Sequence, residues 1–554
     1  MCKYLSFRSN KLFTYLGYKK NLLVLYLLVN PINSALEVLL AYTTAIAIEY
    51  AINGSLDQIG MYIAAFFVYV IVWFLFSLLH TYLRNKILEH AVAHLKQDLM
   101  ERILFSPPTV FHKTNTGTYL SHLTNDCEII RNSYFFELLR LYGQVVQLVI
   151  ALAAMFFISW IIGAFVVFMA LVQVAISTSF KKIISHLGAL YSRQQQAYTQ
   201  TCKETLQSFQ TANLYDVRHE LSNLHAEAAQ QTEHARFRSK LMNSIVNELS
   251  FSAGTVMYLG IFLIGAVLSL KGVLGVGAII AAAQLMGHIA TPLTNISTDI
   301  AELQTSFEIA DHLQAILDIP FQNQPGMAKD RFDSALTVQN LSFHYNQKEI
   351  FHNINCTFEK GKKYLIVGPS GSGKSTLLSL LTGQLPLQNG SITLDGHPLN
   401  QLSTAALHQL ILLSPQEPYL FDWTIAENIR LFRPIAEERI ETLLDQVGLC
   451  QKIRSLPNGI HTRFGEGGNE FSGGEKQRVG LVRALARNAP ILLLDECTSH
   501  LDAVTAKRVE DLLLQLQDTT VILVSHNPSH ALRHAVDKVF VMQNGVLTDE
   551  VVGK

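Results

Sequence analysis

Six runs of about twenty mostly apolar residues occupy the first half of this 554-residue chain, and they constrain its fold more than any other feature. A helix needs about 20 such residues to cross the hydrocarbon core of a bilayer, because it rises about 1.5 Å per residue. The runs therefore predict an all-α domain with six membrane-spanning helices. They lie at residues 22–49, 59–83, 138–158, 161–180, 251–270 and 273–296.

The connections between these runs differ on the two sides of the membrane. Two residues join the third run to the fourth, and two join the fifth to the sixth, so each pair is antiparallel. Segments 81–137 and 181–250 are long, polar and rich in lysine and arginine. The positive-inside rule places them, and with them both termini, in the cytoplasm. We expect helices two to five to continue beyond the bilayer; small separate loop domains are the alternative, but neither segment alternates like a strand.

Composition agrees with a membrane half followed by a soluble half. Charged residues make up 16% of the chain, against about 25% in soluble proteins. The net charge of −1 gives the chain no overall positive potential to attract nucleic acid, so no nucleic-acid partner is expected. No two of the six cysteines have a CxxC spacing, which argues against a zinc site or a disulfide framework. Residues 1–20 form a basic leader, either an amphipathic helix on the membrane surface or a solvated lead into the first span.

A change of pattern marks the domain boundary. Residues 318–335 break the helical pattern with two prolines and a glycine, so we interpret them as a linker between a transmembrane domain at 21–317 and a second domain at 336–554. Short apolar strands then alternate with helices, which predicts an α/β domain with a mostly parallel sheet. The expected strands lie at 336–345, 363–367, 491–494 and 521–524, and a helix begins at 374.

A phosphate-binding loop is the most specific motif. The pattern G-x4-G-K-[ST] follows one apolar strand and opens a helix, which is the context that the motif requires. Its glycines let successive backbone N–H groups point at phosphate oxygens, and the helix N-terminus adds positive potential. Lys374 supplies a charge to the β- and γ-phosphates, and Ser375 offers a hydroxyl to Mg²⁺. The nucleotide-binding residues of this loop are Gly368, Pro369, Ser370, Gly371, Ser372, Gly373, Lys374, Ser375 and Thr376.

Two carboxylates follow the buried strand at 491–494. The C-terminal ends of parallel strands are where α/β sheets bind ligands, so Asp495 and Glu496 fall beside the phosphate loop. Asp495 is predicted to hold Mg²⁺, and Glu496 to act as the general base for the attacking water. Such a pair is a weak motif by itself and gains its meaning from the loop that precedes it.

A third motif is the turn Phe471-Ser472-Gly473-Gly474-Glu475, which leads into a helix. A helix start of this kind binds anions through its free N–H groups. The simpler interpretation is a local cap, with Ser472 as the N-cap residue. Taken alone, the segment favours that simpler interpretation.

Together these residues resemble the ATP-binding cassette (ABC) transporters, and specifically half-transporters of the exporter-like fold. The resemblance covers essentially the whole chain. It implies an α/β phosphate-loop NTPase domain of ABC type behind the six helices, with ATP and Mg²⁺ as cofactors. Matching positions imply that Gln416 is the glutamine-loop residue, His526 the switch histidine, Asp502 part of the D-loop and Tyr345 the ring that stacks on adenine.

The resemblance also implies a dimer. Two ATPase domains close head to tail, so that ATP lies between the phosphate loop of one and the signature residues Ser472, Gly473, Gly474 and Glu475 of the other. Ser375, Gln416 and Asp495 would hold Mg²⁺. Opening of the ATPase dimer after hydrolysis would change the orientation of the membrane-spanning helices. The family's two coupling helices are expected near 111–119 and 214–220.

Polar residues inside a span are functional candidates by default. Glu37 lies midway along the first span. Gln284 and His288 lie four residues apart in the sixth, on one helix face. We expect Glu37 to line a substrate cavity, whereas pairing with another helix is the alternative for all three.

Several residues depart from the family pattern, but none removes a catalytic group. Glu475 replaces a glutamine, and His500 replaces a small residue in the D-loop. Because the D-loop lies at the dimer interface, His500 favours a heterodimer with another half-transporter, and a homodimer is the alternative.

We expect a multi-pass protein of the bacterial plasma membrane that exports a lipophilic or amphipathic compound, drug, lipid or peptide. The alternatives are a transporter of a metabolite such as a thiol, haem or siderophore, and an ATP-gated channel or regulator.

Overall fold

A computed structural model describes residues 10–52, 56–321, 326–345, 348–465 and 471–550. Contacts between Cα atoms divide the chain into two units. The helical unit comprises residues up to Glu101 together with Thr116–Asp318, and the α/β unit comprises Arg102–Asn115 together with Ile319 onward. The start of the leader, four linker residues and the residues just before Phe471 lie outside the described residues.

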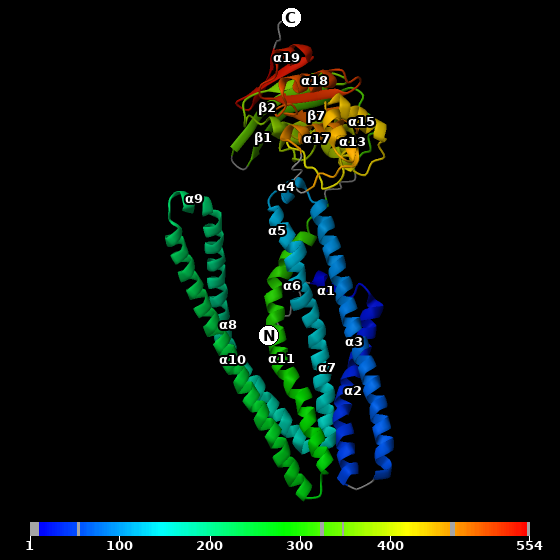
Figure 1. Cartoon of the computed structure of the whole chain (residues 1–554), viewed down its shortest axis with the longest axis vertical. Coiled ribbons are helices and arrows are strands. Elements are labelled where there is room, and N and C mark those ends of the chain that lie inside the picture. The colour runs from blue at the N-terminus through cyan, green and yellow to red at the C-terminus, as the bar shows by residue number, and fades with distance from the viewer. Residues whose placement is uncertain (1–9, 53–55, 322–325, 346–347, 466–470, 551–554) are drawn as a thin grey trace. The chain divides into compact units, whose positions relative to one another are not determined.

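The helical unit is built from long helices (Figure 1). Two π-helical stretches, η1 (His122–Asp126) and η2 (Ile130–Phe135), interrupt one of them. The helices are α1 (Asn10–Leu16), α2 (Lys20–Ile52), α3 (Leu56–Leu104), α5 (Thr116–Ser121), α6 (Cys127–Ile129), α7 (Phe136–Ile158), α8 (Trp160–Gln207), α9 (Phe209–Leu214), α10 (Arg218–Leu270) and α11 (Val276–Leu317).

Six helices in the described part of the chain are long and apolar enough to cross a membrane. The helices α3, α8 and α10 contain 49, 48 and 53 residues, or about 70–80 Å at 1.5 Å per residue. A bilayer core is only about 30 Å thick. The predicted extensions of the spanning helices beyond the bilayer are therefore confirmed, and neither polar segment forms a separate loop domain.

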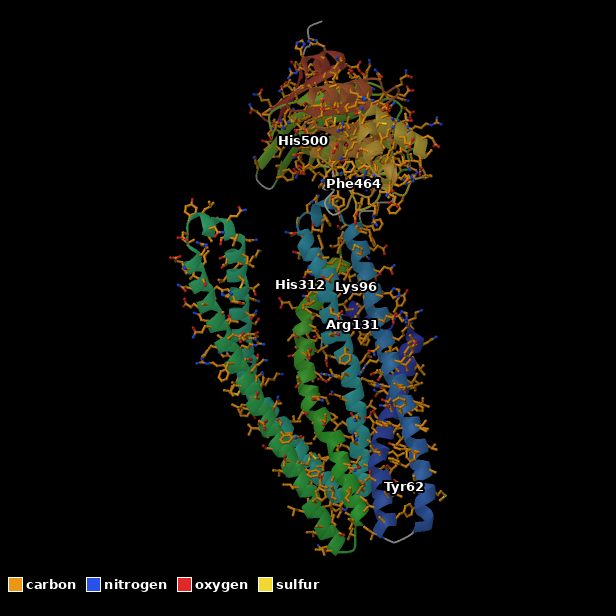
Figure 2. All side chains as sticks on the ribbon, in the orientation of Figure 1. Tyr62, Lys96, Arg131, His312, Phe464 and His500 are labelled. Atoms are coloured by element: carbon orange, nitrogen blue, oxygen red, sulfur yellow. The ribbon has the colours of Figure 1, made fainter. Side chains whose placement is uncertain are left out.

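The two ends of the helical unit differ in chemistry. At one end the joints are short: Ser159 alone separates α7 from α8 and caps α8 by accepting a hydrogen bond from the Ile162 N–H. Tyr62 lies at this end, whereas Lys96, Arg131 and His312 lie toward the other end (Figure 2). Toward that other end α8 and α10 run together as a long hairpin, with α9 at its tip (Figure 1).

Apolar packing and an arginine that pairs with buried carboxylates hold the spans together. Small and branched side chains of α2, α7, α8, α10 and α11 form one buried cluster, which includes Val38, Met155 and Ile289. Arg140 on α7 pairs with the fully buried Asp299 on α11. A charge removed from water is tolerated only when it is paired, so this contact fixes α7 against α11.

The short helices of the connections lie slightly away from their expected places. A four-residue helix, α4 (Pro108–Phe111), precedes the expected segment 111–119, because Pro108 at its first turn starts a helix there. Likewise α9 ends where the expected segment 214–220 begins, and that segment covers a turn and the start of α10. In the leader, Leu12 and Leu16 of α1 are buried, and Tyr15 donates to Asp98 on α3 at 2.7 Å.

The α/β unit contains two sheets. Its elements after α4 are β1 (Ala335–Tyr345), β2 (Lys348–Glu359), β3 (Lys363–Val367), α12 (Lys374–Leu381), β4 (Asn389–Leu394), β5 (His397–Pro398), η3 (Leu399–Gln401), α13 (Thr404–Leu410), β6 (Ile411–Ser414), α14 (Ile425–Arg430), α15 (Glu437–Gln446), α16 (Cys450–Ser455), η4 (Gly459–His461), α17 (Gly473–Leu485), β7 (Ile491–Asp495), α18 (Ala503–Leu514), β8 (Thr520–Ser525), α19 (His530–Ala535), β9 (Lys538–Gln543) and β10 (Val546–Glu550).

The larger sheet has the strand order β10-β9-β3-β8-β7-β6 and is parallel except for its edge strand β10. It confirms the predicted parallel sheet. Strands β3 and β7 are buried throughout, because apolar clusters cover both faces. The sequence did not predict the second sheet, an antiparallel one of order β2-β1-β4-β5. The parallel strands β3, β7 and β8 end at a common edge, and that edge carries the functional residues.

Asp395 fastens the end of the linker to the α/β unit. One carboxylate oxygen accepts from the backbone N–H groups of Ser334 and Ala335 at 2.7 and 3.0 Å. The other accepts from the Asp333 N–H at 2.9 Å and pairs with Lys329 at 3.0 Å. Burial opposes ionisation, but these donors outweigh it and hold the pKa of Asp395 below its ordinary value.

We expect Asp395→Asn to destabilise the α/β unit, because an amide cannot accept all four of these bonds. Loss of one or two charge-assisted bonds costs about 1–3 kcal/mol, which lowers the unfolding temperature by roughly 2–10 °C. Because the folded-state pKa is lowered, this stability is present above the ordinary pKa and is lost as pH falls through the folded value. Thermal unfolding of the full chain in detergent at pH 7 and at pH 3 measures both effects. Asp330→Asn, at an exposed linker position, is the matched control, and an Asp395→Asn deficit that did not shrink between pH 7 and pH 3 would contradict the assignment.

Candidate functional site

The phosphate loop bends sharply between β3 and α12. Gly371 and Gly373 have φ of 77° and 102°, in the left-handed region that favours glycine. A Cβ on Gly373 would lie 2.4 Å from the Phe351 ring, and one on Gly368 would lie 2.2 Å from the Met542 carbonyl oxygen. The loop therefore depends on glycine both for its turn and for the space that it occupies.

Lys374 lies inside this loop and is 4% exposed. Its ammonium donates to the carbonyl oxygens of Gly368 and Pro369, each at 2.9 Å, and lies 3.3 Å from His526 Nδ1. Burial lowers the pKa of Lys374, while the nearby Glu496 and Asp495 oppose that shift. The carbonyl contacts hold the ammonium over the loop, at the place where phosphate oxygens are expected.

Glu496 brings together the residues predicted for hydrolysis. It follows β7 with φ of 49°, a left-handed conformation that is unusual for a side chain other than glycine, asparagine or aspartate. One carboxylate oxygen accepts from Gln416 Nε2 at 2.9 Å, and the other lies 2.5 Å from His526 Nε2. His526 Nδ1 lies 3.1 Å from the Gly368 carbonyl oxygen. The structure thus connects the predicted general base, the predicted glutamine-loop and switch residues, and the phosphate loop.

Asp495 and the loop hydroxyls fit a hydrated Mg²⁺ ion beside phosphate. Asp495 is 9% exposed, and within the described residues its Oδ1 has no hydrogen-bond partner. Ser375 is exposed at the start of α12. Magnesium prefers carboxylate, hydroxyl and phosphate oxygens, which this set would provide. Among the described residues no group of three or more acidic, histidine or cysteine side chains forms a complete metal site, as expected for an ion that phosphate and water also coordinate.

The signature residues begin α17 with a reciprocal cap. Ser472 Oγ accepts from the Glu475 N–H at 3.2 Å, and the Glu475 carboxylate accepts from the Ser472 N–H at 2.8 Å. Glutamate and glutamine serve equally in such a capping box, which accounts physically for Glu475 at a position where the family usually has glutamine. Ser472 still has a hydroxyl proton to donate. A Cβ on Gly474 would lie 2.5 Å from the His500 carbonyl oxygen, so glycine is required where the D-loop passes.

The remaining predicted nucleotide residues lie apart from this cluster. Asp502 caps α18 by accepting from the N–H groups of Val504 and Thr505. Tyr345 ends β1 with 48% of its surface exposed and packs edge-on against Phe343. Within the described residues neither contacts Glu496. Both are exposed, and their predicted roles stay predictions.

Sequence reasoning missed one residue of this site. Gln477 on α17 is 3% exposed, and its amide donates to the backbone oxygens of Glu496 at 2.7 Å and of Gln416 at 3.3 Å. These two bonds connect α17 to Glu496 and to Gln416. A buried glutamine on the apolar face of an amphipathic helix was the available signal.

The structure also places the intramembrane candidates. Glu37 on α2 and His288 on α11 both contact Gln147 on α7, at 3.0 and 2.9 Å. Gln147 was not among the predicted residues, although it is a polar residue inside the predicted span 138–158 and the rule that selected Glu37 would have found it. Gln284 is exposed and does not join this group within the described contacts.

Comparison with known proteins identifies the family. Residues 351–499 match the family described as ABC transporter, and residues 22–293 match the ABC transporter transmembrane region. The chain is an ABC half-transporter of the exporter-like fold. ATP therefore binds the α/β unit of this multi-pass membrane protein, hydrolysis of ATP is coupled to transport, and two halves work together as a dimer.

Relatives match the ABC half-transporter over nearly its whole length. Multidrug resistance-like ATP-binding protein MdlB of Buchnera aphidicola subsp. Schizaphis graminum is 28% identical over 96% of this chain and 92% of its own. The ATP-dependent lipid A-core flippase of Desulfotalea psychrophila is 28% identical over 93% of this chain and 92% of its own. A solved bacterial Atm1-family ABC exporter with ATP bound has a TM-score of 0.78 at 22% identity, covering 96% of this chain and 95% of that one, and it shows the common fold.

Proposed function

We propose that this half-transporter exports a lipophilic or amphipathic compound, a drug, lipid or peptide, from the cytoplasm of a bacterial cell. The observation that carries the proposal is the joining of Glu496, Gln416, His526 and the phosphate loop in one contact network behind six spans. The names of the relatives, a multidrug resistance-like protein and a lipid A-core flippase, support this substrate class.

The arrangement suggests how each residue acts on ATP. Lys374 exchanges its carbonyl partners for β- and γ-phosphate oxygens, and the Glu496 carboxylate takes a proton from the attacking water while His526 and Gln416 hold it in place. Mg²⁺, held by Ser375, Gln416 and Asp495, would neutralise phosphate charge when bound. Ser472, Gly473 and Gly474 of each subunit would donate to the γ-phosphate on the other, since their hydroxyl proton and helix-start N–H groups are available. ATP thereby bridges two α/β units, and its hydrolysis removes the bridge.

We further propose that the partner is a different half-transporter. His500 introduces a bulky imidazole into the D-loop, where its Nδ1 lies 3.2 Å from Ser499 Oγ, and its place on the α/β unit is labelled in Figure 2. In a homodimer two such rings would enter the same interface. Light scattering and ATPase assays on the purified chain alone test this, because an inactive monomer that a second half-transporter rescues supports the heterodimer, whereas an active dimer of identical chains contradicts it.

Transport into inverted vesicles tests the export proposal. The dimer, reconstituted with its α/β units outward, is expected to accumulate fluorescent lipid analogues or hydrophobic dyes inside the vesicle when ATP is supplied, but not with a non-hydrolysable analogue. Uphill accumulation distinguishes a pump from an ATP-gated channel, which would only equilibrate the dye. Flux that stops at equal concentrations, or accumulation confined to a thiol, haem or siderophore, would contradict the proposal.

A further inference from the structure

A ring of polar side chains joins three spanning helices. We define the polar ring as Asn33 and Glu37 on α2, Gln147 on α7 and His288 on α11. Gln147 Nε2 lies 3.0 Å from Glu37 Oε2 and 2.9 Å from His288 Nδ1. Asn33 Nδ2 donates to Glu37 Oε1 at 2.9 Å. The three helices pack against one another, so the ring belongs to one continuous interface.

The polar ring lies near the middle of the bilayer. Glu37, Gln147 and His288 each lie about 11–15 residues from the short-loop end of their helix. At 1.5 Å per residue this depth is about 16–23 Å, about halfway through a membrane. An ionisable group at that depth is costly, which makes it a candidate for a function.

Several hydrogen-bond acceptors in and beside the polar ring have no donor. A carboxylate only accepts, so the amide nitrogen of Asn33 faces Glu37 and its oxygen points elsewhere. Asn33 is 6% exposed, and its Oδ1 has no partner within the described residues. The same holds for Oδ1 of Asn30 and Oε1 of Gln144, one helical turn away on α2 and α7. These three unpartnered atoms on α2 and α7 are acceptors, whereas α3 carries two unpartnered donors, Trp73 Nε1 and Arg84 Nε. The acceptors beside the polar ring favour a donor-rich or positively charged ligand.

No protein cation balances Glu37. Among the ion pairs of the described residues none joins Glu37 to a lysine or arginine, and its donors are two neutral amides. The facing titratable groups are His288 on α11 and Tyr69 on α3, whose hydroxyl donates instead to the Leu36 carbonyl oxygen. His288 Nδ1 contacts the Gln147 amide nitrogen rather than the Glu37 carboxylate. The carboxylate charge therefore lacks a permanent partner.

Apolar side chains of α2 and α11 lie next to the polar ring. Val38, Leu285 and Ile289 next to it belong to the buried cluster of the spans. Glu37, Gln147 and His288 are themselves partly exposed, so a ligand can reach them from the surface of the helical unit. A single negative charge beside apolar walls fits a molecule with one positive charge and an apolar body.

We propose that the polar ring recognises the positive charge of a lipophilic organic cation, with Glu37 as the charge partner. The proposal rests on the export function above and narrows its substrate class. Mg²⁺ or Ca²⁺ fits less well, because each takes about six or more oxygen ligands, and the ring offers one carboxylate and a few amide oxygens. Among the described residues no three His, Cys, Asp or Glu side chains group here for another metal ion. A quaternary or protonated organic amine needs only the charge and the apolar walls.

Binding of two ions of matched shape tests the proposal. The full dimer in nanodiscs is titrated with tetraphenylphosphonium, a lipophilic cation, and with tetraphenylborate, an anion of nearly the same size. We expect saturable binding of the cation alone. Glu37→Gln, which keeps the shape but removes the charge, should weaken cation binding at least tenfold, because a charge-assisted contact in a low-dielectric site is lost.

Glu49→Gln is the matched control, since Glu49 is an exposed acid on the same helix, and it should leave cation binding unchanged. Empty nanodiscs correct for partition into lipid. Absence of saturable cation binding, equal binding of the anion, or an unchanged affinity in Glu37→Gln would each overturn the proposal. ATP turnover and dye accumulation are measured on the same preparations. If they persist without cation binding, the export function stands while the cation site is rejected; if they fail in the wild type, the export function itself fails.

Discussion

Glu496→Gln is expected to lower ATP turnover by two to three orders of magnitude. The carboxylate is held by Gln416 at 2.9 Å and His526 at 2.5 Å, with an orientation fixed by the bond from the Glu496 N–H to the Val524 carbonyl oxygen. A positioned general base contributes about 10²–10⁴ in rate, and a neutral amide of the same shape cannot take the proton. ATP binding should remain, because Lys374 and the loop are untouched.

Steady-state ATPase assays on the reconstituted dimer, with equilibrium ATP binding measured in parallel, check this expectation. Because hydrolysis is slow while binding is intact, the variant should also accumulate as an ATP-bound closed dimer, which cross-linking between α/β units detects. Glu510→Gln is the control: Glu510 is a partly buried acid of the same unit that accepts from Ser529 at 3.1 Å, away from the phosphate loop. Near-normal turnover in Glu496→Gln would refute the assignment of the base.

The sequence predicted those features whose signal is local. Apolar runs of spanning length identified the six helices, and a strand–loop–helix pattern identified the phosphate loop between β3 and α12. The family resemblance then supplied Gln416 and His526, which carry no local pattern of their own. The structure adds the physical reason for their grouping, since both contact the carboxylate of Glu496.

Features that depend on long-range packing were not predicted. Gln477 and Gln147 are ordinary glutamines in sequence, and only the fold brings their amides between Gln416 and Glu496 or between Glu37 and His288. Of the antiparallel sheet the sequence predicted only β1, at 336–345, and not its partners β2, β4 and β5. The short helix α9 was misplaced because a helix boundary depends on where the α8–α10 hairpin turns.

Lys374→Ala is expected to abolish transport by removing nucleotide binding. The ammonium is the one group of the loop that brings a full positive charge to the phosphates, and its stem is buried among loop atoms. Loss of a buried charge contact costs about 2–5 kcal/mol, which corresponds to at least a thirtyfold weaker affinity for ATP. Equilibrium ATP binding to the full dimer and ATP-driven dye accumulation measure the two effects.

Two further variants separate lost binding from lost folding. Lys374→Met keeps an apolar stem of similar length, so it should fold as the wild type does and still lose ATP affinity. Lys363→Ala removes another buried lysine, whose ammonium donates to the Leu516 carbonyl oxygen at 2.8 Å at the opposite end of β3; it should lower the unfolding temperature but not the ATP affinity of the folded fraction. Both lysines are buried and donate to carbonyl oxygens. A loss of ATP affinity in Lys374→Met but not in Lys363→Ala would therefore show that Lys374 contacts the phosphates. Transport that survived Lys374→Met, or ATP affinities that fell equally in both variants, would remove the physical basis for ATP as the bridge between the two halves.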